Sequence, residues 1–156
     1  MPVYPVRHAH AGSRSSWTGD DRDRPLSDKG RRQAAGLAER LAGHDIARVV
    51  SSPYARCVET VEPVAEQAGV PVEHDPALAE GARPDAVVER LAAGAADGLV
   101  ACSHGDVIPK VLRLLLAQGL EADAGAVSQK GSVWVLDHDG RRFTHGTYHP
   151  PAAPAG

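Results

Sequence analysis

The sequence of 156 residues is long enough to bury the hydrophobic core of one domain, and its composition is that of an ordinary globular protein. Its apolar content is 42%, its charged content is 24%, and its formal net charge at pH 7 is -3. A negative net charge argues against nucleic acid and against an anionic membrane surface as partners. No charged start followed by a long apolar run is present, so we expect neither a signal peptide nor a membrane span.

The cysteines and the basic residues add two expectations about setting and ligand. Cys57 and Cys102 are the only cysteines and lack the spacing of a zinc site, so we expect a reducing, cytoplasmic environment. The basic residues are 14 Arg and only 3 Lys. Arginine binds phosphate through a planar, two-pronged guanidinium, but a GC-rich genome enriches arginine too, so composition leaves both explanations open.

Short apolar runs alternate with helical patterns along the chain, which predicts an α/β domain. The first strand is expected at residues 3–6, although Pro2 and Pro5 disfavour a central position in the sheet. A polar loop follows over residues 11–25. Ser27 then stands where the N-cap of an amphipathic helix is expected.

The next part of the chain repeats the order of strand and helix. A second strand at residues 46–50 runs into Ser51-Ser52-Pro53, which has the pattern of an N-cap followed by Pro at the first helical position. We expect this helix to end at Gly69 and to be kinked or split at Pro63. A short third strand is expected at residues 70–73.

The last third of the chain predicts two more helices and a hairpin. One helix begins near Pro84, and another follows a strand at residues 99–103 and closes near Gly119. Residues 132–136 and 142–147 flank a polar turn and predict a β-hairpin, which would form an antiparallel edge on a mainly parallel sheet. The predicted fold class is therefore α/β, a three-layer α/β/α sandwich.

Three of the predicted strands end in polar residues, namely Arg7-His8, Ser51-Ser52 and Ser103-His104. In open α/β sheets, ligands bind at the carboxyl ends of the strands, where the N-termini of the following helices favour an anion. Arg56, in the first turn of the second helix, would face the same crevice. Two arginines, two histidines and helix N-termini in one place predict a phosphate-binding site.

The chemistry of this site follows from its residue types. A neutral imidazole at His8 is a competent nucleophile and would form a phosphohistidine intermediate. Arg7, Arg56 and His104 would neutralise the charge of the phosphoryl oxygens in both transition states. No carboxylate cluster suited to Mg²⁺ occurs among these residues, so cationic side chains would take the place of a metal. We therefore expect no metal and no cofactor.

Two alternative interpretations concern residues near this site. His10 forms a His-x-His pair that can chelate a metal, although no further ligand follows at a useful spacing and Arg7 would repel a cation. Arg14, Arg22 and Arg24 in the first loop are able to select an anionic substrate, but a solvated polar loop is the simpler interpretation.

Together, these residues resemble the histidine phosphatase superfamily, which has a phosphoglycerate mutase-like fold. The resemblance covers residues 2–138 and rests on Arg7-His8 after a strand, Ser52-x-x-x-Arg56-x-x-x-Thr60 and Ser103-His104-Gly105. It implies that His8 is the nucleophile and that Arg7, Arg56 and His104 form the phosphate pocket. It also implies a histidine phosphatase domain over residues 1–149, followed by a Pro/Ala-rich tail at 150–156 that we expect to be flexible.

Within the superfamily, the chain is similar in its short length to members of the compact branch, which includes the SixA-type protein phosphohistidine phosphatases. The segment from Arg7 to Gly12, with Trp17-x-Gly19-Asp20-Asp21 and Arg24-Pro25-Leu26, is similar to the phosphatase domains fused behind nudix hydrolases in some actinobacteria. That second resemblance adds nucleotides and polyphosphate esters to the candidate substrates.

Glu80, in Leu78-Ala79-Glu80-Gly81, falls where mutases and many phosphatases of the superfamily carry a glutamate that protonates the leaving oxygen. The resemblance therefore implies a second catalytic residue at Glu80. The compact phosphohistidine branch often lacks such an acid, and a loop glutamate beside glycine is commonly a surface residue.

The sequence thus predicts a metal-independent phosphatase that hydrolyses a phosphomonoester or a phosphohistidine through phospho-His8. The alternatives are a nucleotide or polyphosphate phosphohydrolase of the nudix-associated type, a mutase, and a non-catalytic module that binds phosphate. The expected partner is a phosphorylated small molecule, a nucleotide or a phosphohistidine protein, and no oligomeric state is predicted.

Overall fold

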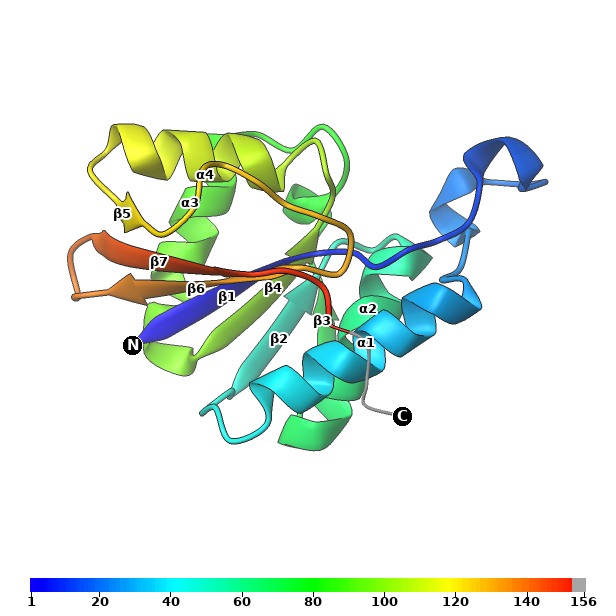
Figure 1. Cartoon of the computed structure of the whole chain (residues 1–156), viewed down its shortest axis with the longest axis horizontal. Helices are drawn as coiled ribbons and strands as arrows, with labels where there is room; N and C mark the ends of the chain where they lie inside the picture. Colours follow the sequence, from blue (N-terminus) through cyan, green and yellow to red (C-terminus); the bar gives the residue numbers. More distant parts are fainter. Residues whose placement is uncertain (153–156) are drawn as a thin grey trace.

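In the computed structural model, which describes residues 1–152, seven strands form one mixed sheet with helices on both faces (Figure 1). The order in the sheet is β3-β2-β4-β1-β6-β7-β5, and the first four of these strands are parallel. The predicted three-layer α/β/α sandwich is confirmed. The predicted tail at 150–156 lies partly outside the described residues. The strands are β1 Pro2–Arg7, β2 Arg48–Ser51, β3 Val72–His74, β4 Leu99–Ser103, β5 Glu121–Ala122, β6 Val133–His138 and β7 Phe143–His149.

The four α-helices divide into two pairs, one on each face of the sheet (Figure 1). They are α1 Asp28–Leu41 and α2 Ala55–Ala68 on one face, and α3 Pro84–Ala93 and α4 Ile108–Ala117 on the other. Alternate residues of β4 enter the two cores: Ala101 packs with the α3 and α4 side chains, and Cys102 packs with those of α1 and α2. Because both faces of this strand are covered, all five of its residues are buried, which explains its continuous apolar sequence.

Strand β1 lies in the middle of the sheet, between β4 and β6, so the expectation that its prolines disfavour a central position is wrong. The backbone N–H of Arg7 points toward β6. That of the next residue, His8, points toward β4, where it donates to the carbonyl oxygen of Ser103. By this alternation, the nitrogen of Pro5 faces β6. The antiparallel pairing with β6 is formed at Val3 and Val6 on either side of Pro5. The missing N–H of Pro5 therefore removes one hydrogen bond from the pairing with β6, and the parallel pairing with β4 continues through this residue.

Helix α2 differs from the prediction at its start and in its middle. It begins at Ala55 with Tyr54 at the N-cap position, and Pro53 is not its first residue. It is also one helix through Pro63, not two. Val61 and Val64 are completely buried on either side of that proline. Burial of such side chains, at about 1.5–3 kcal/mol each, offsets the roughly 3 kcal/mol that an interior proline costs.

The predicted hairpin is present as β6 and β7, which pair in antiparallel register from Val133 with His149 to His138 with Phe143. It does not form the edge of the sheet, because the two-residue strand β5 adds to β7 in parallel. Two residues are too few to produce a recognisable pattern in the sequence. Among the helices of residues 1–152, none is both long enough and apolar enough to cross a membrane.

Candidate active site

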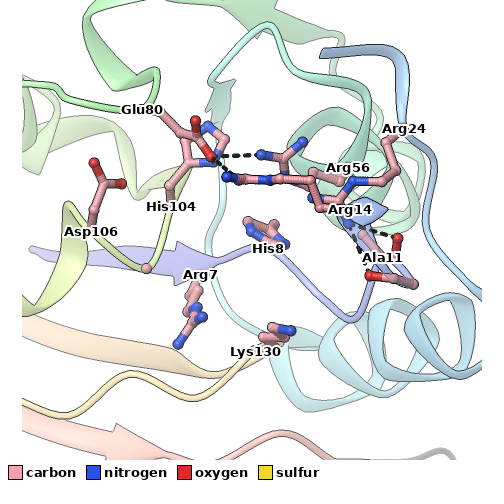
Figure 2. A pocket seen from close by; sticks show the side chains of 12 residues that line it. Arg7, His8, Ala11, Arg14, Arg24, Arg56, Glu80, His104, Asp106 and Lys130 are labelled. Atoms are coloured by element: carbon pink, nitrogen blue, oxygen red, sulfur yellow. Dashed lines mark hydrogen bonds and ion pairs between the residues drawn. The ribbon is translucent and has the colours of Figure 1, made fainter. Parts of the chain in front are cut away.

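The ends of β1 and β4 and the start of α2 surround a cavity of about 510 Å³ at the carboxyl edge of the parallel strands. The polar residues at the ends of the predicted strands indicated a site at this position. The cavity is lined by Arg7, His8, Ala11, Gly12, Arg14, Arg24, Arg56, Glu80, His104, Gly105, Asp106 and Lys130. All five predicted site residues are in this set. Figure 2 shows His8 with Arg14 and Arg56 on one side and Arg7 and Lys130 on the other.

His8 directly follows β1 and is 8% exposed. Its Nδ1 lies 2.8 Å from the carbonyl oxygen of Ala9. Because a carbonyl oxygen only accepts, Nδ1 carries the proton and Nε2 keeps its lone pair. Burial, together with the charges of His104, Arg56 and Arg7, lowers the pKa of His8 to about 3, although the bond to the Ala9 carbonyl oxygen acts in the opposite direction. The imidazole is therefore neutral at physiological pH, the form that a nucleophile requires.

Arg56 is the second residue of α2, and its guanidinium is almost completely buried at 1% exposure. Nη2 donates to Glu80 Oε1 at 2.8 Å and to Asp21 Oδ2 at 3.1 Å, and Nη1 donates to the Asp21 carbonyl oxygen at 2.9 Å. The guanidinium also lies over the ring of Tyr54, with Cζ 4.9 Å from its centroid. The carboxylates hold this cation at the edge of the cavity.

Thr60 stands one helical turn after Arg56 and explains the spacing Arg56-x-x-x-Thr60. Its hydroxyl donates to the carbonyl oxygen of Arg56 and accepts the N–H of Ala9 at 2.9 Å. Helix α2 is therefore tied to the backbone immediately after His8, and this tie fixes His8 relative to Arg56.

His104 follows β4 and is 2% exposed. Its Nε2 lies 2.9 Å from Ser52 Oγ. Ser52 Oγ also accepts the N–H of Tyr54, and in one tautomer of His104 the Ser52 hydroxyl donates its proton to Nε2. The proton of a neutral His104 then sits on Nδ1, which lies 3.9 Å from Glu80 Oε1. His104 thus presents a donor on the side where Glu80 stands.

Arg7 depends on the glycine that follows His104. A Cβ atom on Gly105 would stand 2.5 Å from Cζ of Arg7, so only glycine leaves room for the guanidinium in this position. Nη1 of Arg7 donates to the carbonyl oxygen of Ser128 at 2.6 Å, which fixes the side chain from the other end. The motif Ser103-His104-Gly105 therefore determines the position of the Arg7 guanidinium as well as that of His104.

Glu80 reaches the cavity from the loop after β3. Its Oε1 accepts from Arg56 and, at 3.0 Å, from Nη2 of Arg14. The next residue, Gly81, donates its N–H to Asp106 at 2.8 Å, which anchors this loop beside the turn after β4. The prediction that Glu80 lies in the site is consistent with this geometry, and its side chain is about one third exposed.

The loop at residues 11–25 is more than the solvated loop that the sequence suggested. Arg24 is 7% exposed; its Nε donates to Asp21, and its Nη1 donates to the carbonyl oxygens of Ala11 and Gly12. Asp21 also contacts Arg14 at 3.5 Å. Burial raises the pKa of Asp21, but the bond from Arg24 and the charges of the arginines outweigh burial and lower the pKa below its ordinary value.

Sequence analysis did not single out Asp21 or Lys130. Asp21 appeared only as the last residue of Trp17-x-Gly19-Asp20-Asp21, and no pattern marked Lys130. Burial lowers the pKa of Lys130, and the charges of Arg7, Arg24, Lys29 and Arg56 lower it further. Within residues 1–152, Lys130 makes no hydrogen bond or ion pair, so its ammonium group is available to an anion.

His10 does not lie with His8 in the cavity. Its Nδ1 contacts Ser27 Oγ at 2.6 Å, at the N-terminus of α1. Ser27 caps that helix by accepting the N–H of Gly30, as predicted. Nδ1 of His8 is held by Ala9. The proposed His8-x-His10 chelate is not assembled, and residues 1–152 contain no group of three metal-ligating side chains.

The fold and the cavity define a class of α/β proteins in which a neutral histidine stands among cationic side chains at the ends of parallel strands. The model of the histidine phosphatase superfamily (branch 1) matches residues 3–82 of the chain. The chain belongs to the histidine phosphatase superfamily.

Relatives agree with this assignment. The chain is 34% identical over 139 residues to an 8-oxo-(d)GTP phosphatase from Mycolicibacterium smegmatis, with 86% of this chain and 43% of the relative covered. The chain spans less than half the length of the curated relatives that it matches. The fold is similar to that of the protein histidine phosphatase SixA in complex with tungstate, at a TM-score of 0.71 and 24% identity over 98% of this chain and 97% of that one. A mycobacterial glucosyl-3-phosphoglycerate phosphatase shares the fold at a TM-score of 0.70 and 18% identity, over 98% and 99% of the two chains.

The close approach of Gly105 to Arg7 gives a first prediction. In Gly105→Ala, the new Cβ displaces the Arg7 guanidinium, so the cavity loses a charge-assisted contact to an oxyanion. Inhibition by orthophosphate should weaken by about 10- to 100-fold, the effect of one such hydrogen bond. The matched control is Gly125→Ala, where no atom lies within 4 Å of the added Cβ, and its inhibition constant should not change. Equal inhibition of Gly105→Ala and wild type would contradict the role of this contact.

The lowered pKa of His8 gives a second prediction, on stability. The pKa is about 3 in the folded protein and 6.5 without the fold, so between these values only the unfolded chain binds the proton. Stability from this group is complete above pH 6.5 and is lost as the pH falls below it, by about 2 kcal/mol between pH 7 and 5. Urea unfolding at both pH values should show that the free energy of unfolding of wild type falls by about 2 kcal/mol more than that of His8→Gln. Equal losses would show that His8 is not held neutral.

Proposed function

We propose that this chain is a metal-independent phosphatase that hydrolyses a phosphomonoester or a phosphohistidine through a phosphorylated His8. One observation carries the proposal. His8 is neutral, its Nδ1 proton is held by Ala9, and its unprotonated Nε2 belongs to a ring that lines a cavity containing three further candidate phosphate ligands, Arg7, Arg56 and His104. This combination supplies a nucleophile and the cations that stabilise a phosphoryl group in transfer.

In the first step, the lone pair of His8 Nε2 attacks phosphorus, a P–N bond forms, and the bond from phosphorus to the leaving group breaks. Arg7, Arg56 and the Nδ1–H of His104 bind the phosphoryl oxygens, whose charge they neutralise. The proton on His8 Nδ1 stays bonded to the Ala9 carbonyl oxygen, which stabilises the positive charge that the ring acquires.

In the second step, water attacks phosphorus on the opposite side from Nε2, the P–N bond breaks, and Nε2 recovers its lone pair. The water gives up its proton to a base, and orthophosphate leaves. The same three donors act again, because the same equatorial oxygens carry the charge in both transition states. The products are therefore orthophosphate and the protonated leaving group.

Glu80 is the acid that we propose for the first step and the base for the second. In the free protein its carboxylate is paired with Arg14 and Arg56. A phosphoryl group that takes over the donors of Arg56 removes one of these cations from Glu80 and places an anion beside it. In its protonated form, the carboxyl group would donate the proton that the leaving oxygen needs.

The cations of the site support the metal-independent part of the proposal. Three guanidinium groups and one ammonium group line the cavity in addition to Arg7, namely those of Arg14, Arg24, Arg56 and Lys130. They supply the charge that a divalent ion supplies in metal-dependent phosphatases. The cytoplasmic setting is also part of the proposal, and the two unpaired thiols support it.

A nucleotide or polyphosphate phosphohydrolase is the second candidate function. Arg14 and Lys130 line the cavity in addition to the three proposed phosphate ligands and would supply countercharge to a second phosphate of the same substrate. The relative from Mycolicibacterium smegmatis, an 8-oxo-(d)GTP phosphatase, supports this candidate. A purely phosphate-binding module is disfavoured, because a module needs the cations but does not need the neutral, oriented His8.

A trapped phosphoenzyme tests the proposal. When wild type is quenched rapidly with a labelled substrate in EDTA, we expect an acid-labile, base-stable phosphoryl label, because phosphohistidine is hydrolysed in acid. His8→Ala should carry no label and lose at least about 10³-fold in kcat/KM. His145→Ala, which removes an exposed imidazole of β7, should retain both. Turnover in His8→Ala at the wild-type rate would overturn the mechanism, and inactivation by EDTA would overturn metal independence.

Glu80→Gln tests the acid separately. We expect kcat to fall by about 10²-fold on an alkyl phosphate, whose leaving oxygen needs a proton, and much less on p-nitrophenyl phosphate, whose leaving group does not. The comparison of the two substrates controls for any change in folding or in phosphate binding, which affects both equally. A similar loss on both substrates would show that Glu80 positions Arg56 and does not donate the proton.

A further inference from the structure

Trp17 is an exposed aromatic side chain in the loop that borders the cavity. It is 37% exposed, whereas the other tryptophan, Trp134, is completely buried in the core. The loop at residues 11–25 projects away from the sheet and its helices (Figure 1). Trp17 lines a second hollow of about 250 Å³, together with Ala11, Gly12, Ser13, Ser16, Arg24, Pro25, Leu26 and Ser27. The exposed ring beside a cationic cavity offers a flat apolar face on which an aromatic group can stack.

The ring of Trp17 is held in place by its own loop. Its Nε1 donates to the carbonyl oxygen of Asp20 at 2.9 Å. Gly19 between them has a φ of +118°, a conformation that residues with a side chain rarely adopt, and a Cβ there would stand 3.8 Å from Nε1. The indole is therefore oriented in the free protein, and a ligand need not pay to order it.

The hollow at Trp17 adjoins the phosphate cavity. Ala11, Gly12 and Arg24 line both. Arg24 fixes this shared wall, because its Nη1 donates to both carbonyl oxygens, at 2.9 Å from Ala11 and 3.0 Å from Gly12. Because the two hollows share this wall, a ligand that spans it would have one end at Trp17 and the other at His8.

The chemistry of the two ends is different. The end near His8 carries cationic side chains, including Arg14 and the unpaired ammonium of Lys130, and suits a group with several negative charges. The end at Trp17 is lined by an indole, Pro25 and Leu26, and suits a flat, aromatic group. A nucleoside phosphate combines both groups in one molecule.

We propose that Trp17 stacks on the base of a nucleoside diphosphate or triphosphate whose terminal phosphate is transferred to His8. The inference rests on the proposed function and specifies its substrate class. Stacking on an aromatic side chain tolerates any base but requires one, so phosphates without a base lose this contribution.

Steady-state kinetics with guanosine diphosphate and inorganic pyrophosphate test the proposal. In Trp17→Ala, we expect kcat/KM for guanosine diphosphate to fall by roughly 10- to 100-fold, mainly through KM, and kcat/KM for pyrophosphate to change less than about 2-fold. Trp17→Phe should retain most of the activity because it keeps an aromatic face. Arg22→Ala is the matched control, since Arg22 belongs to the same loop but lines neither hollow.

Fluorescence gives a second readout that does not need turnover. In His8→Ala, guanosine diphosphate should quench the emission of the exposed Trp17, and pyrophosphate should not. The quenching should disappear in the His8→Ala, Trp17→Phe double variant, because Trp134 is buried in the core.

Three results would overturn the proposal. These are equal losses on guanosine diphosphate and pyrophosphate in Trp17→Ala, no loss on either, and a Trp17 dependence seen with a phosphohistidine peptide but not with the nucleotide. Each leaves the phosphorylation of His8 to be judged by the quench experiment alone, so failure of the nucleotide proposal and failure of the mechanism are distinguishable.

Discussion

The buried charge of Arg56 is the constraint on which the rest of the site depends. A guanidinium at 1% exposure has lost its water, a cost of several kcal/mol unless partners replace it. Asp21 and Glu80 are those partners, with bonds of 2.8–3.1 Å. They come from segments 35 residues before and 24 residues after Arg56 in the sequence. The need to neutralise one cation therefore draws the loop at residues 11–25 and the loop after β3 onto the start of α2, and these loops form the walls of the cavity.

The positive charge of the cavity acts on both the ligand and His8. Five Arg and Lys side chains but only two carboxylates line the cavity, so it attracts a phosphoryl dianion. That excess positive charge also disfavours the protonated form of His8, which burial already disfavours, and Nε2 keeps the lone pair that the proposed attack on phosphorus requires. Glu80 lowers the excess while the cavity is free, because it is paired with Arg14 and Arg56. In the proposed mechanism, a bound phosphoryl group competes with Glu80 for the donors of Arg56.

The sequence was sufficient to predict the parts that local patterns determine. The bounds of β4 were predicted residue for residue, because a strand covered on both faces has a continuous apolar sequence that ends at Ser103. Arg56 and His104 were placed with His8 because the carboxyl ends of parallel strands share one edge of the sheet. Contacts between distant loops leave no such pattern. The burial of Arg24, the pairing of Asp21 with Arg56 and the position of Lys130 depend on how loops fold over the cavity, and no periodicity encodes that.

Ser52 shows why a correct motif can be assigned the wrong physical role. Its position before a helix predicted an N-cap, but its hydroxyl instead bonds Nε2 of His104 across 52 residues of sequence, and α2 starts three residues later at Ala55. A helix end has an alternative in solvent for its unpaired N–H groups, whereas a buried imidazole nitrogen has none. The hydroxyl therefore stabilises the fold more at His104, and the same bond turns the Nδ1–H of His104 toward Glu80. A residue that sequence rules assign to helix formation thereby sets the direction of a phosphate-binding donor.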